Sequence, residues 1–285
     1  MILVTGANGS NGSEIVKRLS GMGAAVRAMV RTPSDQAKGI LPGVEIATAD
    51  FDQPGSVRRA LEGVDRVFLV TNSSERVEKQ QLQFVQLAHE AGVRHIVYLS
   101  QLHATKDSPV RFLRYHAVVE EAISSSGMAY THVRPNLYMQ GLLAFRASIA
   151  SEGRFFAPAG EARVSIVDVR DIAALATAAL TGNSHEGKVY DVTGPEALTH
   201  TEMASQLSEA LGKQITFTDI PEAAMRNALV GLGFPHWQAD GLVEDYAHYR
   251  RGEAAGISTA VQDVTGVPPH TLLAFARDYR HAFLL

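Results

Sequence analysis

Glycines near the start of the chain have the spacing of a phosphate-binding turn. Gly6, Gly9 and Gly12 lie between the apolar run 1–4 and the segment 13–22, whose apolar residues recur at helical spacing. Glycines at such a turn let the backbone approach a pyrophosphate, and the first N–H groups of the helix then bind the phosphates. A plain tight turn is the alternative. We predict a dinucleotide site made of Gly6, Ala7, Asn8, Gly9, Ser10, Asn11 and Gly12.

Arg31 indicates which dinucleotide this site accepts. An NAD enzyme places an acidic residue about 20 positions after the glycines to bind the ribose 2′-hydroxyl. Here the second expected strand ends in Arg31, whose guanidinium suits a 2′-phosphate. A solvated arginine is the alternative interpretation. We therefore predict NADP(H) as the cofactor, with Lys38 as a possible additional cation.

Polar residues after later strands would complete the cofactor site. Asp50 closes the third expected strand and can accept a hydrogen bond from the adenine amino group, with Phe51 beside the ring. Capping of the turn that follows is the alternative role for Asp50. Thr71 and Asn72 end the fourth strand and are expected along the middle of the cofactor.

These residues need a parallel sheet to bring them together. Expected strands are 2–4, 25–31, 44–49, 65–70, 95–100, 129–133 and 188–192. Expected helices are 13–22, 53–61, 75–91, 110–125, 141–151, 169–180 and 199–211, the last capped by Thr199 or Thr201, and 153–160 is expected to be a loop. Strands that alternate with helices predict an α/β, Rossmann-type doubly wound parallel sheet, with ligands at the carboxyl ends of the strands.

The regular alternation ends near residue 135, which suggests two parts. We expect an NADP-binding Rossmann domain over 1–140, completed by about 164–194. Residues 141–163 and 195–285 are expected to form a smaller, mostly helical substrate-binding lobe.

Composition excludes several classes of function. The 285-residue chain has no cysteine, so thiolate metal sites and cysteine nucleophiles are excluded, and we expect no metal. The net charge is only −4, no basic tract suggests nucleic acid, and no apolar run reaches the roughly 18 residues of a membrane span. We expect a cytoplasmic protein, a monomer or homodimer, that binds a small aromatic molecule.

Several motifs together resemble the NmrA-like branch of the atypical short-chain dehydrogenase/reductases. They are VTGANGSNG at 4–12, VR at 30–31, DFD at 50–52, GVRHIVYLS at 92–100, YTHVRP at 130–135, VDVRDIA at 167–173 and YDVTGP at 190–195. The resemblance is clear over about two-thirds of the chain. It implies a Rossmann fold with strand order 3-2-1-4-5-6-7, a preference for NADP(H), and a variable carboxyl-terminal lobe. It also implies that Asn136 and Tyr138 flank the nicotinamide.

The chain departs from the wider superfamily at its catalytic motif. That motif, Tyr-x-x-x-Lys followed by x-x-x-Glu, aligns on Glu120 and places His116 at the lysine position and Phe112 at the tyrosine position. The other register starts at Tyr115 and places Val119 at the lysine position. Neither register supplies the pair.

This loss limits the chemistry. Reduction of an isolated ketone leaves a localised alkoxide that needs an acidified tyrosine, whereas a quinone, azo compound or triarylmethane cation spreads the incoming charge. His116, with an ordinary pKa near 6.5, would protonate such a product or bind a carbonyl oxygen. A hydrogen bond to the ribose or backbone is the alternative role.

Candidate substrate contacts are polar residues after the fifth strand and aromatic residues further on. For each of them, loop solvation or core packing is an equal alternative. They are Gln101, His103, Phe112, Tyr138, Phe156 and Trp237, with Phe155 beside Phe156.

We expect an NADPH-dependent reductase of a conjugated aromatic acceptor, with quinones as the favoured class. The main alternative is a non-catalytic NADP(H)-binding redox sensor, which the missing Tyr/Lys pair favours. An isomerase or epimerase that retains its nicotinamide is a third hypothesis, and loss of the tyrosine argues against it.

Overall fold

The computed structural model describes residues 1–32 and 41–284. Lys38, named above as a further cation, lies outside these residues. The chain divides into two compact units. Unit 1 comprises Met1–Ser108, Leu113–Arg134 and Ile172–Tyr190, and unit 2 comprises Pro109–Phe112, Pro135–Asp171 and Asp191–Leu285.

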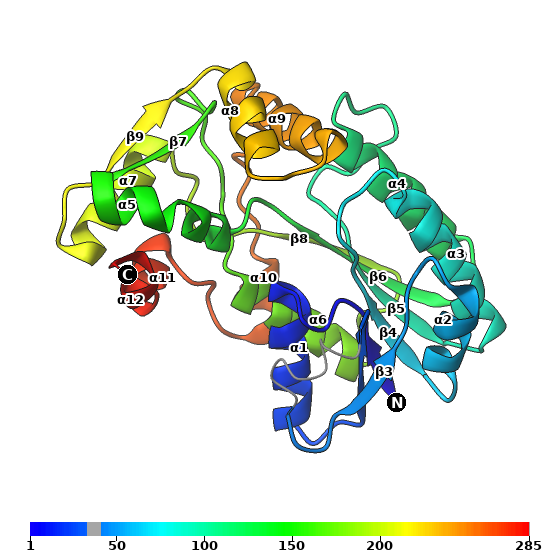
Figure 1. Cartoon of the computed structure of the whole chain (residues 1–285). Helices are drawn as coiled ribbons and strands as arrows, with labels where there is room; N and C mark the ends of the chain where they lie inside the picture. Colours follow the sequence, from blue (N-terminus) through cyan, green and yellow to red (C-terminus); the bar gives the residue numbers. More distant parts are fainter. Residues whose placement is uncertain (33–40, 285) are drawn as a thin grey trace. The chain divides into compact units, whose positions relative to one another are not determined.

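The main sheet has seven strands in the order β3-β2-β1-β4-β5-β6-β8 (Figure 1). The register pairs β1 with β2 and β4, β2 with β3, β4 with β5, and β5 with β6, all in parallel. This is the predicted Rossmann order, since β8 is the seventh strand of the series expected from the sequence. The strands are β1 (Ile2–Val4), β2 (Val26–Val30), β3 (Glu45–Thr48), β4 (Arg66–Leu69), β5 (His95–Leu99), β6 (Ala129–Pro135) and β8 (Lys188–Val192).

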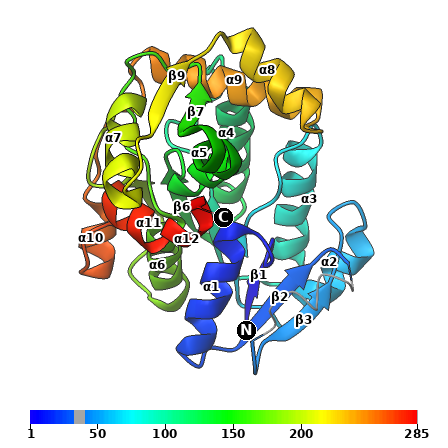
Figure 2. The ribbon, with the colours of Figure 1, turned by 60° about the vertical axis from the view of Figure 1, so that its left-hand side comes forward.

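Helices cover both faces of this sheet, as Figures 1 and 2 show. On one face, α2, α3 and α4 pack with the strands in a single apolar cluster. Helices α1 and α6 lie on the other face (Figures 1 and 2). Ile15 and Leu19 of α1 are fully buried, as predicted. The helices are α1 (Ser10–Gly21), α2 (Pro54–Leu61), α3 (Val77–Glu90), α4 (Arg111–Ser124) and α6 (Val169–Thr181).

Unit 2 contains a second, two-stranded parallel sheet that the sequence analysis missed. Strand β7 (Arg154–Ala157) pairs with β9 (Thr216–Asp219), so the loop expected over 153–160 is wrong. Each strand has only four residues, and the partner of β7 lies about 60 positions further along the chain. Pairing between such distant short segments leaves no local pattern in the sequence.

The rest of unit 2 is mostly helical, as expected. A capping box starts α7 at Thr199, whose side chain accepts from the N–H of Glu202 at 3.1 Å while the Glu202 carboxylate accepts from the Thr199 N–H at 2.8 Å. Of the two threonines proposed as caps, Thr199 is therefore the one used. The helices of this unit are the 3-10 helix η2 (Met139–Phe145), α5 (Arg146–Glu152), α7 (His200–Leu211), α8 (Glu222–Gly231), α9 (His236–Arg250), α10 (Ala260–Thr265), α11 (Leu272–Asp278) and α12 (Arg280–Leu284).

Candidate functional site

The glycine turn joins β1 to α1 in a geometry that only glycine permits. Gly6 has a φ of +56°, which an L side chain rarely adopts. A Cβ atom on Gly12 would lie 2.2 Å from the carbonyl oxygen of Gly6, and the N–H of Gly9 donates to the same oxygen at 2.9 Å. The turn therefore requires glycine at both ends, which a plain connection between a strand and a helix does not.

The first turn of α1 provides the groups that a pyrophosphate needs. The helix begins at Ser10, one turn earlier than the predicted start at residue 13, so Ser10, Asn11 and Gly12 form its first turn. The N–H groups of a first turn have no acceptor within the helix, and the N-cap residue Gly9 has no side chain to supply one. Nearby, Oδ1 of Asn11 is buried without a hydrogen-bond partner among the described residues. An unpaired buried acceptor beside free N–H groups fits a bound nucleotide that brings its own donors.

Arg31 directly follows β2, and its side chain is exposed. Neither Val30 nor Thr32 on either side of it is acidic, so the carboxylate that NAD enzymes place at this point is absent. The contact of Arg31 with a 2′-phosphate stays a prediction.

Asp50 and Phe51 both make contacts that stabilise the fold. Oδ1 of Asp50 accepts from the N–H of Asp52 at 2.9 Å, which is the turn-capping role given above as the alternative. The ring of Phe51 packs on Phe84, with 5.4 Å between the ring centroids. Within unit 1, Asn72 lies exposed in the loop after β4, and Thr71 beside it is half-buried.

Asn136 is held entirely by unit 2. Its amide nitrogen donates to Oγ of Ser165 and to the carbonyl oxygen of Ala254, both at 2.9 Å, and its oxygen accepts from the N–H of Leu137 at 2.8 Å. Both amide hydrogens are thereby used within the protein. These bonds give Asn136 a structural role that the sequence analysis did not foresee.

His116 lies on α4 and is almost completely buried, with 8% of its surface exposed. Its Nδ1 is 2.7 Å from the hydroxyl of Tyr98, and the ring of Tyr115 lies against it with centroids 4.1 Å apart. Burial lowers the pKa of His116 to about 3, because the charged imidazolium loses its hydration. At neutral pH the side chain is therefore uncharged, because burial lowers the pKa well below the ordinary value near 6.5.

Tyr98 is a polar residue of this site that the sequence analysis missed. It is fully buried in β5, and its hydroxyl donates to Oε1 of Gln81 on α3 at 2.8 Å. Nε2 of Gln81 donates in turn to Oγ1 of Thr71 at 2.8 Å. The available signal was a tyrosine in the middle of an apolar strand, because a buried phenol needs a hydrogen-bond partner.

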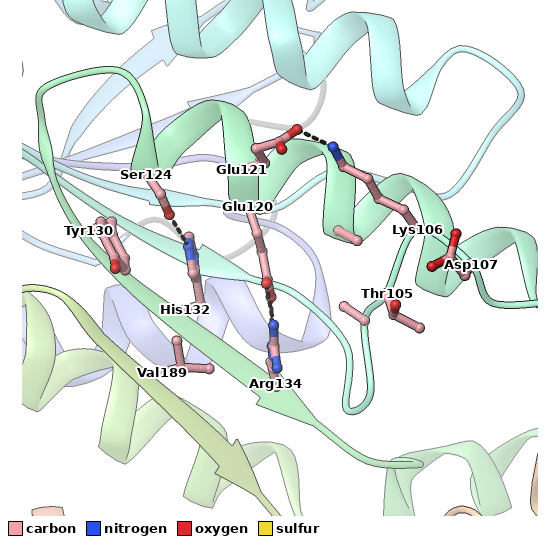
Figure 3. A pocket seen from close by; sticks show the side chains of 12 residues that line it. Thr105, Lys106, Asp107, Glu120, Glu121, Ser124, Tyr130, His132, Arg134 and Val189 are labelled. Atoms are coloured by element: carbon pink, nitrogen blue, oxygen red, sulfur yellow. Dashed lines mark hydrogen bonds and ion pairs between the residues drawn. The ribbon is translucent and has the colours of Figure 1, made fainter.

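The glutamate used for the motif alignment forms an ion pair. Glu120 on α4 accepts from Nε of Arg134 on β6 at 2.8 Å and from a second guanidinium nitrogen. Figure 3 shows this pair beside a depression of about 500 Å³ that is also bordered by Lys106, Tyr130 and His132. Twelve residues line this depression, and none of them is a predicted cofactor or substrate residue.

Aromatic candidates for the substrate pocket meet within unit 2. Phe112 and Trp237 lie with ring centroids 5.4 Å apart, and the guanidinium of Arg111 lies 5.6 Å from the Trp237 ring. Gly241 on α9 faces the Phe112 ring: a Cβ there would lie 2.3 Å from it. Phe112 and Trp237, named separately as substrate candidates, are thus ring neighbours, and Phe112 is buried.

The other candidates differ in exposure. Phe155 is in the core of unit 2, whereas Phe156 and Tyr138 are half-buried. In unit 1, Gln101 is half-buried, and the exposed His103 is the one described non-glycine residue with a positive φ, +65°. These two residues lie in one turn, since the N–H of Ala104 donates to the carbonyl oxygen of Gln101.

Two features are absent from the described part of the chain. It has no cluster of three or more carboxylate or imidazole side chains placed to hold a metal ion. None of its helices has both the length and the apolar character needed to cross a membrane.

Strand order, helical layers and the glycine turn define a Rossmann-type protein. The model of the NmrA-like family matches residues 1–265, and the chain belongs to this family. It is 38% identical to an NAD(P)H azoreductase of Xenophilus azovorans, over 99% of each chain. It is 37% identical to a (4-alkanoyl-5-oxo-2,5-dihydrofuran-3-yl)methyl phosphate reductase of Streptomyces griseus, again over 99% of each. Among solved structures, the NADPH complex of the Escherichia coli quinone oxidoreductase QOR2 is 29% identical, with a TM-score of 0.86 over 98% of this chain and 99% of that one.

Proposed function

We propose that this protein is an NADPH-dependent reductase that transfers hydride to a conjugated acceptor, with quinones as the favoured class. The observation that carries the proposal is the glycine turn: a Cβ on Gly12 would lie 2.2 Å from the carbonyl oxygen of Gly6, so only glycine allows the tight turn that presents the first N–H groups of α1 to a phosphate. Relatives that are 30% or more identical reduce azo compounds, quinones and an unsaturated lactone, according to their names. All of these acceptors are conjugated.

The residues of unit 1 would bind the cofactor in an extended form. The first-turn N–H groups of α1 hold the pyrophosphate, and Arg31 holds the 2′-phosphate through charge-assisted hydrogen bonds. When bound, NADPH supplies the hydride. Thr71 and Asn72 lie after β4, at the carboxyl edge of the sheet where such a ligand passes.

The neutral state of His116 decides how the product is protonated. Hydride transfer to a quinone gives the hydroquinone monoanion, and one proton then completes the hydroquinone. An imidazole with a pKa of about 3 is not charged near neutral pH, so it does not act as an imidazolium acid. Water supplies this one proton, and this suffices because a conjugated product anion is weakly basic.

A panel of acceptors tests the proposal. NADPH oxidation is followed with several quinones, azo dyes and simple ketones, and NADPH binding is measured separately by fluorescence titration. We expect turnover with conjugated acceptors and none with simple ketones. Tight NADPH binding without any turnover would favour the redox sensor instead, and turnover with ketones alone would refute the argument from the missing Tyr/Lys pair.

A further inference from the structure

A continuous chain of hydrogen bonds runs through unit 1 from the loop after β4 to helix α4. Gln81 donates from Nε2 to Oγ1 of Thr71 at 2.8 Å and accepts at Oε1 from the Tyr98 hydroxyl at 2.8 Å. The Tyr98 oxygen is also 2.7 Å from Nδ1 of His116. Gln81 and Tyr98 are 1% and 0% exposed, so water cannot replace either of these bonds.

The direction of the bonds fixes the position of one proton. A phenol has a single hydrogen, and Tyr98 gives it to Gln81. Towards His116 the phenol oxygen can then only accept, so Nδ1 must carry a hydrogen and donate it. A neutral imidazole has one N–H, which leaves Nε2 with a lone pair.

We propose that Gln81 and Tyr98 are positioning residues that hold His116 as the Nδ1–H tautomer, so that Nε2 accepts a hydrogen bond from a hydroxyl or N–H group of the bound ligand. This inference rests on the proposed function for its ligand, although not for the tautomer. It reverses the expected role of His116: an unprotonated Nε2 repels the carbonyl oxygen of an acceptor and attracts a donor group.

The surroundings of His116 favour one fixed orientation of the ring. Tyr115 lies against the imidazole, with 34° between the ring planes, and its hydroxyl is 3.3 Å from Oγ of Ser73. The Tyr98 ring lies on another side, with centroids 5.6 Å apart. Rotation of the imidazole to exchange its nitrogens would break the bond to Tyr98 and disturb this packing. The ligand therefore meets the same nitrogen each time.

Nitrogen NMR of the full chain reads the tautomer without any turnover. In protein labelled with ¹⁵N-histidine, the two ring nitrogens of a neutral imidazole have distinct shifts according to which one carries hydrogen. The signals of His116 are identified by their loss in His116→Gln. We expect a protonated Nδ1 and an unprotonated Nε2 in the wild type. The opposite pattern would overturn the proposal.

Two variants test whether Gln81 sets this direction. In Gln81→Met the Tyr98 hydroxyl loses its acceptor and donates to Nδ1 instead, so the His116 proton moves to Nε2. Tyr98→Phe removes the partner of Nδ1 and is expected to favour the same change. Gln86→Met is the matched control, since Gln86 lies on the same helix but is exposed and bonded to Glu90. An unchanged tautomer in Gln81→Met would refute the positioning role.

Paired azo dyes, with and without an amino group near the azo bond, test the ligand class. We expect the wild type to have about tenfold higher kcat/KM for the amino dye, as one hydrogen bond would give. Gln81→Met should lose this preference, whereas Gln86→Met should keep it. The ligand contact would be rejected if wild type and Gln81→Met had the same ratio of kcat/KM for the two dyes while NMR showed the expected tautomers. Absence of turnover with either dye would instead count against the proposed function, and the NMR result would stand.

Discussion

Acidification should destabilise unit 2 through the buried imidazole of His200. This side chain is 2% exposed, and its ring packs near those of Phe217 and Tyr246, with centroid distances of 5.1 and 5.8 Å. Its Nδ1 is buried without a hydrogen-bond partner among the described residues. Burial lowers the pKa of His200 from its ordinary value of 6.5 to about 4, and the charge of Asp219 only partly opposes this shift.

The size and sign of the effect follow from this shift. Between pH 6.5 and 4 the unfolded chain takes up a proton at this position and the folded chain does not, so stability falls as the pH falls. Each pH unit inside this window costs up to about 1.4 kcal/mol. From pH 7 to pH 5 the loss assigned to His200 is therefore about 2 kcal/mol. Above pH 6.5 this contribution does not change.

His200→Phe removes the titrating group and keeps an aromatic ring among aromatic neighbours. Urea unfolding at pH 7, 6 and 5 measures its effect, and the fluorescence of Trp237 reports on unit 2 because this is the one tryptophan in the chain. We expect the variant to lose about 2 kcal/mol less than the wild type between pH 7 and 5. His281→Phe is the matched control, since it makes the same change at an exposed position of unit 2. An identical pH dependence in wild type and His200→Phe would refute the reasoning.

Three further predictions concern unit 1. In Gly12→Ala the new Cβ would lie 2.2 Å from a backbone oxygen of the turn, so the Kd for NADPH should rise at least about tenfold; an unchanged Kd in fluorescence titrations would contradict the phosphate role. Arg31→Ala should weaken NADPH binding about 10- to 100-fold, as expected for loss of a charged hydrogen bond, with little change for NADH. Equal losses for both cofactors would remove the basis for the NADP preference. Arg134→Leu leaves the Glu120 carboxylate buried without its partner and should lower the free energy of unfolding by about 3 kcal/mol. The double variant with Glu120→Leu should regain most of this loss, and a failure to do so would mean that packing of the arginine, rather than charge pairing, stabilises the fold.

Local signals predicted the Rossmann part well. The apolar strands, the amphipathic helices and the glycine turn each lie within one continuous segment, so their patterns are visible without knowledge of distant contacts. The observed strand order matches the expected series. The start of α1 was misplaced by one turn, because the helix begins at Ser10 and its first turn includes Gly12, a residue type that usually disfavours helix.

Distant contacts account for the errors. The pairing of β7 with β9 depends on two four-residue segments about 60 positions apart, and neither has an extended apolar pattern. The role of Asn136 depends in a similar way on Ser165 and Ala254, which come from separate loops of unit 2. No spacing in the sequence indicates such partners.

The sequence by itself determined which residue types stand where a cofactor and an acceptor would bind: glycines in the first turn, Arg31 after the second strand, and His116 where the superfamily has lysine. Only the tertiary structure decided the charge and hydrogen bonding of that histidine. The pKa of an imidazole depends on how much water and which partners surround it, and those partners, Tyr98 and Gln81, come from other elements of the fold. A residue type is therefore local information, whereas its protonation state is a property of the folded environment.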